Sequence, residues 1–121
     1  TPPINVFSGR VEGGKLFIGD DCVLTVGGLE DQEVTVGIRP EGFILDENGP
    51  LTCHLNNVEV MGRDVSVVST HPASLKPSVR SIIDADDRSG LNGEVVRYSV
   101  KPHKLFVFRK ETEKRLAFEV K

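Results

Sequence analysis

The stretch VGIRPEG at residues 36–42 predicts where one β-strand ends and where the chain changes direction. Apolar residues occupy alternate positions from Val34 to Ile38, and this period of two places one apolar face inward. Pro40 has no N–H to give to a neighbouring strand, and it restrains Arg39 to an extended backbone. We therefore expect a strand that ends at Arg39 and runs into a structural corner.

The guanidinium of Arg39 is expected to have an anionic partner, because it directly follows an apolar strand. A carboxylate is the group that best matches a guanidinium. Glu41 or Asp64 could supply it. We favour a corner held by this ion pair over a ligand site.

Short runs with strand character lead up to this stretch. They cover residues 5–12, 15–18 and 22–26, with turn signals at Gly13-Gly14 and Asp20-Asp21 between them. Each run is too short for a typical helix, so the first third of the chain predicts three consecutive strands.

The same alternation continues after the corner. Val58 and Val60 are followed by Val65 and Val67 beyond Gly62, which indicates two strands joined by a turn.

The segment Leu105–Phe108 is apolar on both faces and predicts a central strand, or a strand beneath another part of the chain. Residues 72–77 have room for one short helical turn. Further breaks fall at Asn48-Gly49-Pro50, Ser89-Gly90 and Asn92-Gly93.

These short strands predict an all-β fold, namely a small OB-like β-barrel with additional antiparallel strands. No stretch of ten residues sustains helical periodicity, and a length of 121 residues suits a single domain. The core is expected to consist of valine, isoleucine, leucine and the six phenylalanines.

Composition narrows the possible functions. Hydrophobic residues make up 38% and charged residues 27%, as in ordinary globular proteins. A net charge of −3 without a basic run argues against nucleic acid as a partner, because such binding relies on neutralising phosphates. No apolar run reaches the roughly 20 residues of a transmembrane helix. No signal peptide is recognised, and Cys22 and Cys53 are expected to be reduced thiols.

No catalytic, cofactor-binding or metal-binding residue is predicted. The three histidines lack a second ligand at metal-binding spacing, and no Gly-x-Ser-x-Gly sequence marks a nucleophile. Gly13-Gly14-Lys15 lacks the spacing of a phosphate-binding loop. Phe43–Glu47 has the form of an apolar strand ending in Asp-Glu, but no phosphate-binding loop accompanies it, so a turn is expected there.

The chain resembles a known family. Residues 36–41, VGIRPE, resemble the signature of the TOBE-type C-terminal domain on ATPase subunits of the maltose and sn-glycerol-3-phosphate importer class. Pro2–Phe7 is similar to the family's P-x-x-N-x-F segment, and Val58–Asp64 to its V-E-x-x-G-x-E/D strand and turn. Lys104–Leu116 resembles the closing hairpin, with two departures: Arg109 replaces the usual aspartate and Glu113 the usual glycine.

The resemblance implies that residues 1–121 are one TOBE-type C-terminal domain, a fragment of a larger ABC ATPase subunit whose ATPase domain is absent. The start at Thr1, directly on Pro2-Pro3, is what an excised fragment would show. The matching positions are expected to be architectural and not catalytic: Asn5, Phe7, Gly37, Arg39, Pro40, Glu41, Gly62, Asp64 and Phe108.

The implied function is an accessory regulatory and dimerisation domain in import of a sugar or related solute. The fragment itself would need no cofactor, whereas the full-length subunit would be a transport ATPase that uses ATP and Mg²⁺. Implied partners are a second copy of the subunit, the permease subunits through the ATPase domain, and, in some members of the family, a regulatory protein or small molecule. The implied location is cytoplasmic, peripheral to the inner face of the cell membrane.

Two other functions compete with this one. The first is a β-barrel that binds a small ligand, either an oxyanion or a sugar, and is stabilised by it. The second is an OB-like barrel for single-stranded nucleic acid, which would need exposed aromatic side chains on which bases can stack.

Overall fold

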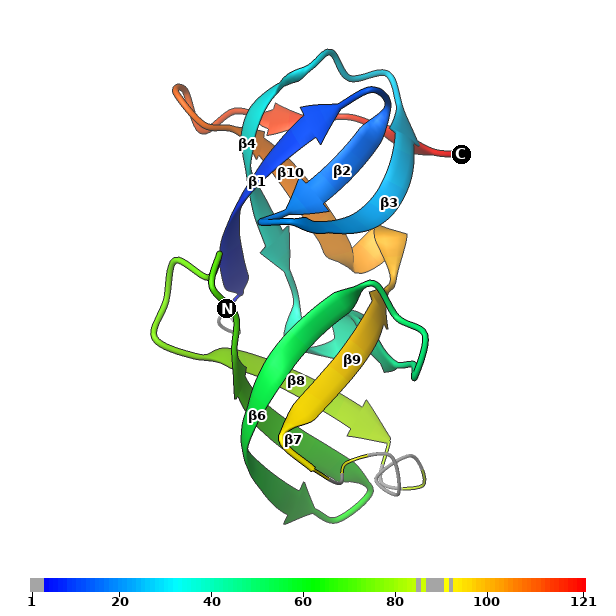
Figure 1. Ribbon diagram of the computed structural model, residues 1–121, viewed down its shortest axis with the longest axis vertical. Helices are drawn as coiled ribbons and strands as arrows, with labels where there is room; N and C mark the ends of the chain where they lie inside the picture. The colour runs from blue at the N-terminus through cyan, green and yellow to red at the C-terminus, as the bar shows by residue number, and fades with distance from the viewer. Residues whose placement is uncertain (1–3, 85, 87–90, 92) are drawn as a thin grey trace.

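The computed structural model describes residues 4–84, 86, 91 and 93–121. Predictions made for Pro2-Pro3, Ser89-Gly90 and Asn92 lie outside these residues. The regular elements of the described part are β-strands and short 3₁₀ turns, so the fold is all-β, as predicted. The strands form two antiparallel sheets at opposite ends of the molecule (Figure 1).

The first sheet is a nearly closed barrel of seven strands in the order β11-β10-β4-β1-β2-β3-β12. Its strands are β1 Asn5–Glu12, β2 Lys15–Ile18, β3 Asp21–Gly27, β4 Gln32–Ile38, β10 Leu105–Arg109, β11 Arg115–Leu116 and β12 Glu119–Val120. The two outermost strands are consecutive in the chain. The C-terminal segment therefore pairs with β10 at one edge of the sheet and with β3 at the other.

The second sheet is a half-barrel of five strands in the order β5-β9-β6-β7-β8. Its strands are β5 Phe43–Leu45, β6 Leu51–Met61, β7 Asp64–Thr70, β8 Val79–Asp84 and β9 Val95–Val100. All five lie between β4 and β10 in the sequence, so the half-barrel is an insertion into the barrel.

The chain passes between the two sheets at two adjacent 3₁₀ turns, η1 Pro40–Gly42 and η3 Pro102–Lys104. We call residues 39–42 and 101–104 together the neck. The Arg39 amide donates to the Lys104 carbonyl at 3.1 Å, and the Lys101 amide donates to the Gly42 carbonyl at 2.8 Å. The outgoing and returning chains are therefore bonded side by side, where the sequence predicted a corner.

One apolar core runs through both sheets. Phe7, Ile38 and Leu105 of the barrel belong to the same buried cluster as Leu51 and Tyr98 of the half-barrel. Desolvation raises the pKa of the Tyr98 phenol to about 12, and its hydroxyl lies 2.8 Å from the Ser81 hydroxyl. The continuous core means that the two sheets do not pack as separate bodies.

Most of the predicted strands are confirmed. The structure gives 5–12 and 15–18 with the predicted bounds, and it extends the third run by one residue at each end. The β6–β7 hairpin turns at Gly62, whose φ of 66° lies in the left-handed region that glycine enters without strain.

The helical turn predicted within residues 72–77 is wrong. These residues form turns and bends, and Ser74 makes an isolated antiparallel bridge with Phe7. The backbone bonds to β1, since the Ser8 amide donates to the Ala73 carbonyl and the Leu75 amide donates to the Val6 carbonyl, each at 2.8 Å. Hydrogen bonding to the edge of β1 satisfies the backbone N–H and C=O groups of this segment better than a single turn of helix would.

Both cysteines are free thiols in the structure. Cys53 points into the core, and burial raises the pKa of its thiol to about 11. None of the described segments forms a helix with the length and apolar character that crossing a bilayer requires.

The loop between β10 and β11 contains the position at which glycine is usual in the resembled family. Glu113 occupies it with a φ of 59°, in the left-handed region. A non-glycine residue there costs about 1–2 kcal/mol. The replacement of the family's usual glycine by Glu113 therefore occurs at a position where the backbone conformation favours glycine.

We expect Glu113→Gly to raise the free energy of unfolding by about 1 kcal/mol, because relief of this strain exceeds the extra freedom of glycine in the unfolded chain. Urea unfolding measures the change. Lys114→Gly is the matched control in the same exposed loop, and it is expected to be neutral or destabilising. A loss of stability in Glu113→Gly would contradict the prediction.

Candidate functional site

The predicted architectural residues are distributed over the barrel, the neck and the half-barrel. Pro40 and Glu41 form the first two positions of η1, and Pro40 is buried. Gly37 and Phe108 lie next to the neck on β4 and β10, and a Cβ atom at Gly37 would come within 2.8 Å of the Ile4 Cδ1. Glycine therefore leaves room over β4 for the Ile4 side chain.

Asn5 joins the two sheets through its buried side chain. Its Nδ2 donates to the Ile38 carbonyl at 3.1 Å and to the Arg80 carbonyl at 2.8 Å, while its Oδ1 accepts from the Arg80 amide at 2.8 Å. Ile38 ends β4 in the barrel and Arg80 lies on β8 of the half-barrel. The amide thus satisfies three backbone groups at the contact between sheets, which is an architectural role.

A second polar contact ties β3 to the half-barrel. The buried His71 Nδ1 accepts from the Ala73 amide at 3.0 Å, so its Nε2 carries the proton and lies 2.8 Å from the Asp21 Oδ2. The same carboxylate oxygen accepts from the Thr52 amide at 3.2 Å. The His71 ring packs edge-on against Phe7, with centroids 5.9 Å apart. This pair holds backbone in place, and neither member was singled out by sequence reasoning.

The predicted ion pair of Arg39 is wrong for the described part of the chain. Glu41 instead pairs with Lys104 across the neck, with 3.7 Å between Oε1 and Nζ. Arg39 places its guanidinium 5.3 Å from the centroid of the Phe106 ring. A flat guanidinium can stack on an aromatic face, so an ion pair is not the sole way to accommodate it beside an apolar strand.

Asp64 begins β7 and lines a groove of about 380 Å³ between β5 and β8, together with Glu41, Asp84 and Lys101. Gly62 sits in the preceding hairpin. The described residues contain no group of three or more histidine, cysteine or acidic side chains arranged to hold a metal ion.

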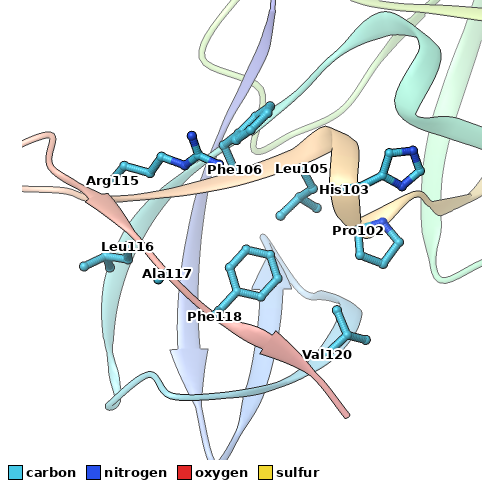
Figure 2. A pocket seen from close by; sticks show the side chains of 9 residues that line it. All are labelled: Pro102, His103, Leu105, Phe106, Arg115, Leu116, Ala117, Phe118 and Val120. Carbon is cyan, nitrogen blue, oxygen red and sulfur yellow. The ribbon is translucent and has the colours of Figure 1, made fainter.

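A second groove, of about 560 Å³, lies along the C-terminal segment (Figure 2). The groove results from the path of the C-terminal segment. Its strand β11 pairs with Val107 and Phe108 of β10, and the chain then separates from β10 so that β12 can pair with β3. The gap is walled by Leu105 and Phe106 on one side and by the segment 115–118 on the other. Phe118 extends into the gap in Figure 2, and Pro102 and His103 stand at one end.

Arg115 lies at the other end of this groove, with its guanidinium 4.6 Å from the centroid of the Phe106 ring. Phe106 is thus contacted by two guanidinium groups, from Arg39 and Arg115. The sequence placed Arg115 in a closing hairpin but gave no signal for the pair of contacts, because Arg39 comes beside Phe106 only in the folded chain.

The aromatic residues offer no open stacking platform. All six phenylalanines and Tyr98 are buried or half-buried, and guanidinium groups already cover Phe17 and Phe106. Binding of single-stranded nucleic acid relies on exposed rings, so the surface does not favour that function.

Comparison with known proteins gives two relatives. The chain is 25% identical over 117 residues to the sn-glycerol-3-phosphate import ATP-binding protein UgpC of a Ruegeria species, which covers 97% of this chain and 33% of that protein. It is 33% identical over 72 residues to the Fe(3+) ions import ATP-binding protein FbpC of Photobacterium profundum, covering 54% of this chain and 20% of that protein. No family model matches the chain. The chain therefore spans a third or less of the length of these two relatives.

Proposed function

We propose that this chain is a TOBE-type accessory domain, with regulatory and dimerising roles, of the ATP-binding subunit of an ABC importer. The observation that carries the proposal is the similarity to UgpC, which covers nearly the whole chain but only a third of the relative. The all-β barrel fits an accessory domain, and residues 1–121 would form one such domain. ATP hydrolysis would then belong to a separate part of the subunit.

The solute is proposed to be a sugar or a related compound. The two relatives differ in their named solutes, sn-glycerol-3-phosphate in one and Fe(3+) ions in the other, but both are import ATP-binding proteins. The similarity of this chain to both relatives therefore supports a common role in the ATP-binding subunit more strongly than it supports a common solute.

No catalytic role is proposed for the chain itself. Asp46 and Glu47, the acidic pair that follows the apolar strand β5, lie in a turn, where the Asp46 Oδ1 accepts from the Asn48 amide at 2.9 Å. A carboxylate engaged in its own turn is a structural group. ATP and Mg²⁺ would act in the ATPase domain of the full-length subunit.

The proposed partners are a second copy of the subunit, the permease subunits through the ATPase domain, and a regulatory protein or small molecule. The subunit would lie in the cytoplasm at the inner face of the membrane. We place self-association at the end of the β6–β7 hairpin, where Val60 and Met61 are 53% and 59% exposed. Val60 and Met61 follow each other in a strand and point to opposite faces, so a partner that encloses the tip of the hairpin would remove both from water.

Light scattering over a concentration series, with and without ATP and Mg²⁺, tests this proposal. We expect a dimer that forms as concentration rises, is unaffected by nucleotide and is weakened at least 10-fold by Met61→Glu. Leu75→Glu is the matched control, because Leu75 is also 60% exposed but lies in the loop beside β1. A strict monomer would refute self-association by this chain, and a change in mass on adding nucleotide would refute the absence of nucleotide binding.

A further inference from the structure

The outer half of β6 has a neighbouring strand on one side only. Strand β9 pairs with Leu51–His54 at the inner half of β6, and the last backbone bond on that side runs from the Leu55 amide to the Glu94 carbonyl at 2.7 Å. Among the strands that the structure describes, residues 57–61 pair with β7 alone. The β6–β7 hairpin lies at the end of the half-barrel away from the barrel (Figure 1), so one backbone edge of residues 57–61 is open.

The open edge consists of the backbone groups of Val58 and Val60. Met61 and Asp64 flank the turn of the hairpin as a directly opposed pair, and a turn of this length joins its flanking residues by a hydrogen bond. Hydrogen-bonding directions alternate along an antiparallel strand, so Glu59 and Met61 turn their N–H and C=O groups toward β7. Val58 and Val60 therefore turn theirs away from β7, toward the open side.

The far side of β7 gives the same alternation. The Arg80 backbone on β8 bonds to the Asn5 side chain through both its N–H and its C=O, so these groups face away from β7. Val68, which lies opposite Arg80, must then bond to β6, where its partner is Asn57. Asn57 is an even number of residues from Met61, so the two arguments agree.

This edge lacks the features that commonly protect edge strands. Proline and lysine on the edge, or a covering segment, discourage pairing with another chain. Residues 57–61 read NVEVM and contain neither proline nor lysine, and the irregularity of β6 comes earlier, between Leu55 and Asn57. Val60 and Met61 are 53% and 59% exposed, and Glu59 is also exposed. The edge can therefore serve as a template for a further strand.

The segment is suited to pairing with its own copy, because Val58-Glu59-Val60 reads the same in both directions. A two-fold axis at Glu59 would place Val58 opposite the partner subunit's Val60, and each such pair would exchange two N–H···O=C bonds. The valine side chains lie on the same face of the sheet as Val65 and Val67, their buried partners on β7. The apolar inner face of the half-barrel would thus continue across the axis.

We propose that two copies of this chain join by antiparallel pairing of residues 57–61, so that their two five-stranded sheets become one continuous sheet. This inference rests on the self-association proposed above and specifies its mode, in which backbone hydrogen bonds hold the partner. Pairing over so short a segment buries much less than the roughly 1,600 Å² of a standard interface. The dimer formed by this chain alone is therefore weak and requires high protein concentration.

Two substitutions at Val60 separate backbone pairing from apolar contact in the light-scattering series. Val60→Pro removes an N–H that makes no bond to β7, and proline is tolerated on the open side of an edge strand. We expect it to weaken the dimer about 20-fold or more, because both copies lose a hydrogen bond. Val60→Thr keeps the N–H and the branched shape but is polar, and it is expected to weaken the dimer less than about 5-fold. Association through apolar contact alone would reverse this order.

Hydrogen exchange of the wild-type chain provides an independent measurement. As concentration rises through the range in which the dimer forms, exchange is expected to slow most at the amides of Val58 and Val60. The amides of Glu59 and Met61 bond to β7 in the monomer already, so their exchange is expected to change less.

Glu59 tests the position of the two-fold axis. Pairing about this residue places two carboxylates directly opposite each other, which is unfavourable. We therefore expect Glu59→Gln to tighten the dimer about 3-fold or more. Glu30→Gln is the matched control, because Glu30 is also exposed but lies between β3 and β4 of the barrel. Its replacement is expected to change the affinity less than about 1.5-fold.

The possible results separate this inference from the proposal on which it rests. The amide spectrum of each variant verifies that the fold is kept. A dimer that Val60→Pro leaves intact would overturn strand pairing but leave self-association standing, and unchanged affinity in Glu59→Gln would overturn the axis at that residue. A monomer at every concentration would overturn both proposals and leave the open edge to a strand of a different protein.

Discussion

Asn5→Ala is expected to lower the free energy of unfolding by about 3 kcal/mol. The substitution removes three hydrogen bonds and leaves the Ile38 carbonyl and the Arg80 amide and carbonyl without this partner. Each buried backbone group that loses its partner costs about 1–3 kcal/mol, although water that enters the space lowers the sum. Urea unfolding followed by circular dichroism measures the loss.

Asn57→Ala is the matched control for this measurement. Asn57 is exposed on β6, and no hydrogen bond of its side chain occurs among the described residues. We expect its replacement to change stability by less than about 0.5 kcal/mol. Equal effects of the two substitutions would show that Asn5 does not hold the sheets together.

Phe7→Ala is expected to cost about 4 kcal/mol. Phe7 is 0% exposed, and it contacts the barrel core together with the His71 ring. Truncating a buried phenylalanine loses its transfer free energy and leaves a cavity, which together amount to about 3–5 kcal/mol. The same unfolding experiment measures the change.

Phe17→Ala provides the comparison for Phe7. Phe17 belongs to the adjacent strand β2, but its ring is only half-buried and lies under the Arg10 guanidinium. Truncation of Phe17 removes less buried apolar surface than truncation of Phe7 and leaves no enclosed cavity. The expected loss in free energy of unfolding is therefore about 1–2 kcal/mol. A loss of stability in Phe17→Ala as large as that in Phe7→Ala would contradict the assignment of Phe7 to the core.

The sequence predicted the local elements well because their signals are local. Alternating valines marked β4, β6 and β7, and glycine pairs or Asx residues marked the turns between the early strands. The segment Leu105–Phe108 was correctly assigned to an inner strand, since β10 lies between β4 and β11. Its apolar outer face is explained by the guanidinium groups that cover Phe106.

The arrangement of the elements could not be predicted in the same way. Nothing in the order of strands indicates that residues 43–100 leave the barrel and return, or that residues 115–120 bridge the two edges of its sheet. The partner of Arg39 was missed for a related reason. Glu41 was close in sequence, but the chain reversal at the neck brings Lys104 to Glu41 and Phe106 to Arg39.

The outgoing and returning chains lie side by side at the neck. With respect to chain topology, the half-barrel is therefore a very long loop between β4 and β10 of the barrel. Its ends, Gly42 and Lys101, are held together by a 2.8 Å hydrogen bond, and Leu51 and Tyr98 within it belong to the core that it shares with the barrel. The entropic cost of closing a loop rises slowly, by about 0.6 kcal/mol for each doubling of length. The outer loops and hairpins of the inserted segment can therefore change in length at little cost to β1–β4, provided that the shared core and the backbone facing Asn5 and Asp21 are kept. Divergence between relatives of this fold should thus accumulate in the half-barrel.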